Sequence, residues 1–197
     1  RGVACYFSGD VEGVAERARQ LWPREPVFRT AVEQCLVTIA RLTGAAMSRM
    51  GDATSLPMAF ASGAEGVRLT GAVKFAFEYG LAELLGSYGI EPVAVGGHGV
   101  GEFVAACRAG VVSVEDALRL VHARDVAVAA ESGAADRTSF VEVISQIEFS
   151  TPQRRLMSGA TGKWVEAEVV AADYWLRLAG AVALGAPARS ALINDGH

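Results

Sequence analysis

The apolar and polar positions of this chain alternate between short apolar runs and longer segments with helical spacing. Apolar runs at residues 3–7 and 92–95 predict short buried strands. Ser113 and Asp116 form a capping box, which marks the start of a helix. Apolar residues recur every three or four positions in five segments, which predicts helices over residues 14–21, 26–42, 70–88, 102–109 and 113–130.

The remaining segments carry weaker patterns. Residues 43–69 contain four glycines and no sustained period, so we expect loop with one or two weak helical turns. Residues 131–138 are typical of a linker, and the alternating apolar residues of 141–149 predict a strand. Further predictions are a short strand at 156–158, a hairpin arm at 164–170, a last helix capped by Asp173, and a tail of undefined structure from Leu192.

The order of these elements indicates a fold class. Strand, helix, strand, turn and helix follow one another along the chain, and no internal repeat is present. Such alternation predicts an α/β fold with a mostly parallel sheet and helices on its faces.

Composition narrows the function classes. The chain has 197 residues, of which 51% are hydrophobic and 20% are charged, and this composition excludes a disordered tail. The net charge of −4 gives no reason to expect nucleic acid as a partner. No apolar run is long enough to span a bilayer, so no membrane association is expected. The three cysteines fit no metal knuckle and suggest buried free thiols in a reducing, cytoplasmic setting. No metal and no cofactor is implied.

The most specific local feature is the glycine-rich turn at residues 97–101, hereafter the elbow. It follows a buried strand and precedes a helix, and its shape is that of the nucleophile elbow Gly-x-Ser-x-Gly. The middle residue is Gly99, which offers no oxygen for attack. Taken alone, these five residues favour a glycine-rich strand-to-helix turn without chemistry.

A longer segment, residues 90–110, gives the elbow a context. It reads Gly-His-Gly-Val-Gly-Glu from Gly97 and continues into an alanine-rich helix that ends in Ala-Gly. This segment resembles the acyltransferase domain of modular polyketide synthases and the malonyl transacylases of fatty-acid synthesis, which read Gly-His-Ser-x-Gly-Glu here. Further segments similar to that family follow in its order, at residues 26–29, 33–35, 77–84, 113–121, 158–162 and 174–175.

The departures from the family pattern are equally informative. The family's nucleophilic serine falls on Gly99. Its catalytic histidine belongs to a small ferredoxin-like subdomain, which should follow residue 130, where the chain is too short to hold it. Its oxyanion loop, Gly-Gln-Gly-x-Gln, falls on residues 9–13, where both glutamines are missing and the segment contains two carboxylates, Asp10 and Glu12. Carboxylates there oppose the stabilisation of a developing negative charge.

Some parts of the family's site have counterparts in this chain. The resemblance places Arg124 on the arginine that pairs with a malonyl carboxylate. Without the rest of that pocket, the favoured interpretation of Arg124 is a solvated helix arginine. The Val100 N–H would point into the former oxyanion site. His98 precedes the lost nucleophile and is expected only to pack the elbow. Cys107, His122 and His197 are expected to have no catalytic role.

These observations favour a degenerate acyltransferase domain, residues 1–197, cut from a larger polyketide synthase and inactive as it stands. Its expected partners are neighbouring synthase domains, such as the ketosynthase and a linker, and an acyl carrier protein. Two alternatives stay open. One is a working or mutationally inactivated acyltransferase that loads malonyl-type units from CoA onto a carrier protein. The other is a non-catalytic pocket that binds an acyl or carboxylate ligand through Arg124.

Overall fold

The fold is built around a small sheet of four strands. A computed structural model describes residues 2–9, 13–44, 71–129, 135–180 and 185–194. The sheet has the order β1-β2-β3-β4, in which the first three strands are parallel and the last pairs antiparallel with its neighbour. The strands are β1 (Ala4–Phe7), β2 (Ala94–Gly97), β3 (Arg155–Ser158) and β4 (Trp164–Val165).

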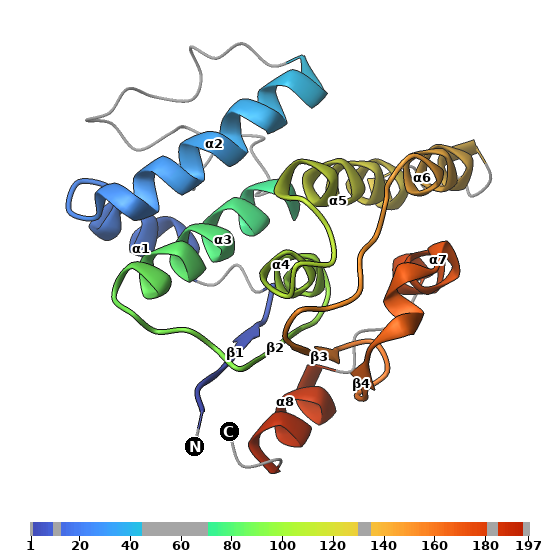
Figure 1. Ribbon diagram of the computed structural model, residues 1–197. Coiled ribbons are helices and arrows are strands. Elements are labelled where there is room, and N and C mark those ends of the chain that lie inside the picture. The colour runs from blue at the N-terminus through green and yellow to red at the C-terminus, as the bar shows by residue number, and fades with distance from the viewer. Residues whose placement is uncertain (1, 10–12, 45–70, 130–134, 181–184, 195–197) are drawn as a thin grey trace.

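Helices cover the two faces of this sheet unequally. Helices α3 and α4 lie over one face, with α2 and α5 beyond them, whereas α8 lies on the opposite face (Figure 1). This arrangement confirms the α/β class that the order of elements predicts. The helices are α1 (Val14–Leu21), α2 (Pro26–Thr43), α3 (Gly71–Ser87), α4 (Val100–Arg108), α5 (Val114–Ala129), α6 (Ala135–Ser145), the short 3-10 helix η3 (Ala167–Val170), α7 (Ala172–Gly180) and α8 (Gly185–Asn194).

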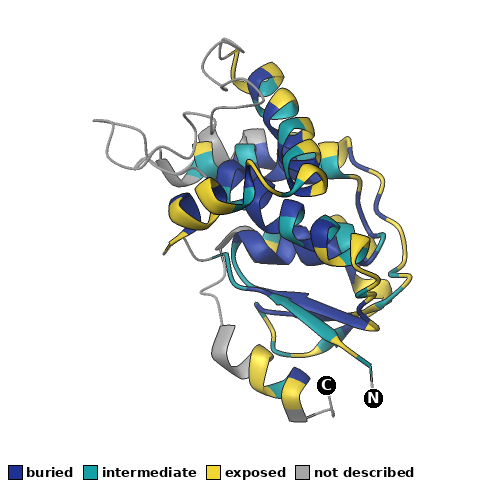
Figure 2. Ribbon diagram, turned by 90° about the vertical axis from the view of Figure 1, so that its left-hand side faces the viewer, coloured by how far each residue is buried: buried dark blue, intermediate teal, exposed yellow. Residues whose placement is uncertain are grey.

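The main core lies between the sheet and the helices of the α4 side, where buried residues gather (Figure 2). Its aromatic centre is Trp175, whose ring centroid lies 5.0 Å from that of Phe149 and 5.7 Å from that of Phe103. The α8 face is much thinner. Its buried apolar cluster consists of Ala94, Met157 and Leu192.

The strand predicted over residues 141–149 is wrong, because the chain forms helix α6 up to Ser145. Phe140 and Ile144 are both buried and lie one helical turn apart, whereas Val141 is 46% exposed. The alternation of apolar residues in this segment therefore reflected a partly apolar helix surface and not the two faces of a strand. Helix α6 packs against α5 and α7.

Other differences concern the ends of elements. Helix α8 was not predicted, and Asp173 lies inside α7 instead of capping it. The hairpin arm is limited to the two residues of β4, followed by η3. Strand β2 begins and ends two residues later than expected, and α4 begins directly after Gly99. Of the glycine-rich stretch 43–69, only its first two residues lie within the described ranges.

One prediction from local sequence and one from the family resemblance are confirmed. Ser113 caps α5, because its Oγ accepts a hydrogen bond from the Asp116 backbone N–H at 3.0 Å and lies 2.8 Å from the Asp116 carboxylate. The described residues between α5 and β3 form one helix and no strand, so they contain no ferredoxin-like subdomain.

The helices are also too short or too polar for a bilayer. Within the described ranges, none of them is long and apolar enough to cross a membrane.

Candidate functional site

The elbow joins β2 to α4 through an unusual backbone conformation. Gly99, the residue before α4, has φ 58° and ψ −122°, values that residues with a side chain rarely adopt. A Cβ placed on Gly99 would have no atom of another segment within 4 Å. The tip of the elbow therefore faces open space, while its conformation favours glycine.

The flanks of the elbow are packed much more tightly than its tip. A Cβ on Gly97 would lie 2.2 Å from the Gly101 carbonyl oxygen, and one on Gly101 would lie 2.1 Å from the Phe7 carbonyl oxygen. Side chains cannot be accommodated at such distances without moving the backbone. The outer glycines of the sequence motif are thus required by the close approach of β1, β2 and α4.

The loop after β1 lies against the same helix end. A Cβ on Gly9 would be 3.3 Å from the backbone nitrogens of Val100 and Gly101. The Gly9 N–H donates a hydrogen bond of 2.8 Å to Oε1 of Glu78, a buried residue of α3. Asp10, the next residue and a predicted site residue, lies outside the described ranges.

His98 contacts the neighbouring strand. Its ring stacks on Tyr6 of β1 with a centroid separation of 5.8 Å, and its Nδ1 lies 3.2 Å from the Tyr6 hydroxyl. Burial, the main cause, raises the pKa of Tyr6 to about 12, so the phenol is protonated and can donate to Nδ1.

Below the elbow, Glu102 forms a buried polar network that sequence reasoning missed. The residue is 1% exposed, and its carboxylate accepts hydrogen bonds from Ser158 Oγ at 2.6 Å, from the Ala160 N–H at 3.2 Å and from the Tyr174 hydroxyl. Burial raises the pKa of the Glu102 carboxyl, and these hydrogen bonds partly oppose that effect. The clue in the sequence was a glutamate directly after the last glycine of the elbow.

Arg124 lies on α5 and is half-buried. Its Nε is buried and has no hydrogen-bond partner among the described residues. The neighbouring Asp125 accepts a hydrogen bond from the Ala72 N–H at 3.4 Å, so its carboxylate is directed to the start of α3. No described hydrogen bond or ion pair joins Arg124 to His98, Gly99 or Val100, which lie together in the elbow.

The cysteines stay unpaired where the structure describes them. Burial raises the pKa of the Cys107 thiol, which lies 3.6 Å from the Ser113 carbonyl oxygen, and raises the pKa of Cys35 to about 12. Raised thiol pKa values disfavour the reactive thiolate. Among the residues that the structure describes, no group of three or more His, Cys, Asp or Glu side chains could hold a metal ion.

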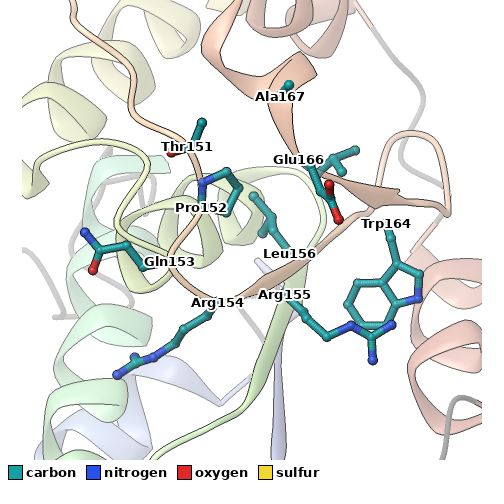
Figure 3. A pocket seen from close by; sticks show the side chains of 10 residues that line it. Thr151, Pro152, Gln153, Arg154, Arg155, Leu156, Trp164, Glu166 and Ala167 are labelled. Atoms are coloured by element: carbon teal, nitrogen blue, oxygen red, sulfur yellow. The ribbon is translucent and has the colours of Figure 1, made fainter.

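A large cavity lies away from the elbow. It has a volume of about 610 Å³ and is lined by the segment before β3 and by the chain from β4 to η3 (Figure 3). At its rim the Arg155 guanidinium lies 3.9 Å from the centre of the Trp164 ring. Because β2 and β3 are parallel and Ala94 is paired with Arg155, this cavity lies at the end of the sheet opposite Gly97.

Comparison with known proteins agrees with this geometry. Residues 12–161 match the family described as acyl transferase domain. The chain belongs to the acyl transferase family. Among curated proteins, the spectinabilin polyketide synthase system protein NorA′ of Streptomyces orinoci is 36% identical over 123 residues, or 62% of this chain. The erythronolide synthase EryA2 of Saccharopolyspora erythraea is 34% identical over 134 residues, or 68% of this chain.

The chain is far shorter than these relatives. The chain spans 3% of the length of the first and 4% of the second. Among solved structures, the acyltransferase domain of the second module of the salinomycin polyketide synthase superposes with a TM-score of 0.77 at 21% identity, covering all of this chain and 62% of that one. MCAT from Streptococcus pneumoniae gives 0.71 at 14% identity, covering 98% of this chain and 86% of that one. At these identities the structures show a shared fold.

Proposed function

We propose that this chain is a catalytically degenerate acyl transferase domain of a polyketide synthase, with a structural or docking role. The observation that carries the proposal is Gly99, which holds the strained conformation of a nucleophile elbow with free space before it but provides no nucleophile. Acyl transfer through a covalent intermediate requires an oxygen or sulfur at this position.

The surroundings of Gly99 support the same proposal. A nucleophile at an elbow needs a base to accept its proton, and the described contact of His98 Nδ1 is with the Tyr6 hydroxyl. The subdomain that carries the family's catalytic histidine has no counterpart among the described residues. In the sequence, both glutamines of the family's oxyanion loop are missing, and the same segment carries the carboxylates of Asp10 and Glu12, whose negative charge would oppose a developing oxyanion.

The relatives support a role in the assembly of a larger protein. The first of them is named as a polyketide synthase system protein and the second as a synthase, and both are far longer than this chain of 197 residues. We infer that residues 1–197 belong to one acyl transferase-like domain within such a synthase in the cytoplasm. Its partners would be neighbouring domains of the same synthase, such as a ketosynthase and a linker, and the acyl carrier protein.

Intact mass spectrometry tests the loss of acyl transfer. The chain is incubated with malonyl-CoA or methylmalonyl-CoA, beside an acyltransferase domain that retains the elbow serine. We expect an acyl adduct on the control protein and none on this chain. A stoichiometric adduct on this chain would overturn the proposal. Its position, mapped by peptide sequencing, would then show whether Cys107 or another side chain had reacted.

A second candidate function, binding of a carboxylate ligand without turnover, is favoured by Arg124. A buried donor without a partner is costly, about 1–3 kcal/mol, and a ligand carboxylate would satisfy it. Malonyl-CoA should then raise the melting temperature of the native chain but not of Arg124→Lys. Arg119→Lys is the matched control, because Arg119 lies on the same helix and is already paired with Asp116. An equal shift in all three proteins would contradict this candidate.

A further inference from the structure

Three sequence segments that are far apart meet at one buried carboxylate. Glu102 follows the elbow, Ser158 ends β3, and Tyr174 lies in α7, 56 and 72 residues away from Glu102. The contacts are hydrogen bonds from hydroxyl groups, and the Ala160 N–H adds a further donor. None of the described salt bridges involves Glu102, so donors and the N-terminal end of α4 stabilise its charge.

The donors require an acceptor at both oxygens of this side chain. Oε1 accepts from Ser158 and Tyr174, and Oε2 accepts from Ala160. An ionised carboxylate has acceptors at every lone pair, whereas an amide must present N–H groups at one end. Glutamine has nearly the same shape, but its amide N–H group would then face one of the N–H or O–H donors that now bind the carboxylate. The chemistry of the network is specific for glutamate.

The network holds the turn at residues 158–161, which is in close contact with the elbow. Ser158 Oγ also accepts hydrogen bonds of 3.3 Å from the Ala160 and Thr161 N–H groups, which fixes the turn after β3. Within that turn, a Cβ on Gly159 would lie 2.0 Å from the Gly97 carbonyl oxygen and 2.6 Å from His98 Cβ. Any shift of the turn is therefore transmitted to the backbone just before Gly99.

We propose that Glu102 is the positioning residue of the elbow: its carboxylate holds the turn 158–161 against Gly97 and His98 and thereby keeps Gly99 at the start of α4. This role does not depend on the proposed function, because an elbow held in this way would exist in an active or an inactive domain. It explains why a buried charge is placed beneath an elbow that has no nucleophile.

A thiol placed at the tip can report on this positioning. In Gly99→Cys, a correctly held thiolate would lie at the N-terminal end of α4, which lowers a thiol pKa below its usual value of about 8.5. Burial raises the pKa of each native cysteine, so Cys5, Cys35 and Cys107 should be alkylated slowly near neutral pH. His98 precedes residue 99 in the chain and contacts Tyr6, and both residues are unchanged in all variants compared.

The experiment compares Gly99→Cys with Gly99→Cys/Glu102→Gln by the pH dependence of iodoacetamide alkylation, followed by intact mass. Loss of positioning and simple removal of a charge would change the thiol pKa in opposite directions. Loss of positioning withdraws the thiolate from the helix end, so we expect the apparent thiol pKa to rise and the rate near pH 7 to fall about two- to fivefold. Loss of a nearby negative charge alone would lower the thiol pKa and increase the rate.

Tyr174→Phe in the Gly99→Cys background is the second variant. It removes one donor to Glu102 but leaves the charge in place, so a smaller change in the same direction is expected. It also keeps the test valid if Glu102→Gln fails to fold, which far-UV circular dichroism would reveal. An unchanged or lowered thiol pKa in the folded variants would overturn the proposed role of Glu102.

Discussion

The base and the tip of the elbow are under different physical constraints. At the base, Gly97 and Gly101 have no room for a side chain, and Glu102 is buried with several hydrogen-bond donors. At the tip, Gly99 faces open space. Packing and hydrogen bonding define the base in this chain, whereas only chemistry would require a side chain at the tip. A domain can therefore keep the elbow and lack its nucleophile.

The most severe way to break this comparison is to add a side chain at the base. Gly101→Ala would place a Cβ 2.1 Å from the Phe7 carbonyl oxygen, so we expect the free energy of unfolding to fall by about 3 kcal/mol. Gly86→Ala is the matched control, because its Cβ would have no neighbour nearer than 3.6 Å and alanine favours a helix. Urea denaturation measures both. Equal stability of the two variants would contradict a close-packed base.

The carboxylate at the base predicts how the free energy of unfolding depends on pH. Glu102→Gln should lower the free energy of unfolding by about 2 kcal/mol, because donors lose their acceptors. Since burial raises the Glu102 pKa, folding disfavours the charged form, and the native protein loses stability as pH rises from the usual pKa of 4.5 through the raised value. The glutamine variant lacks this loss. The difference in free energy of unfolding between the native chain and the glutamine variant should therefore be largest at low pH and decrease as pH rises. Denaturation across that pH range measures it.

A smaller effect is expected at the tip. Gly99→Ser has space for its side chain but keeps a strained backbone, which should cost about 1 to 2 kcal/mol. We also expect no acyl adduct from malonyl-CoA, because the described part of the chain offers a serine there no general base, and the sequence that resembles the oxyanion loop carries Asp10 and Glu12. Gly89→Ser, at another open position with positive φ, is the control for stability. Rapid acylation of a folded Gly99→Ser would show that catalytic parts survive.

The smallest effect is expected beside the tip. Tyr6→Phe removes the hydroxyl that lies 3.2 Å from His98 Nδ1 and leaves the stacked rings in place. We expect a loss of about 0.5 to 1 kcal/mol in the free energy of unfolding, the usual contribution of one hydrogen bond. A thermal melt beside the native chain suffices. A loss as large as that of Glu102→Gln would mean that the base and the tip are not energetically distinct.

Several features of the fold follow from local sequence. The long helices α2, α3 and α5 have apolar residues at helical spacing, and Ser113 provides a recognisable cap. The elbow was evident because glycines at both sides of a strand-to-helix turn reflect close backbone approach. The same local reasoning failed at residues 141–149, where a short apolar pattern fits either a strand or a helix, and packing against α5 and α7 decided for the helix.

The sequence by itself determined the order of most elements and the turn on which the functional argument rests, because both depend on neighbouring residues. Only the tertiary structure decided that Glu102 meets Ser158 and Tyr174, and that Glu78 holds the Gly9 loop. These partners lie 56 to 72 residues apart. Hydrogen bonds over such separations leave no periodic trace in the sequence, since they form only after the sheet has brought the strand ends together.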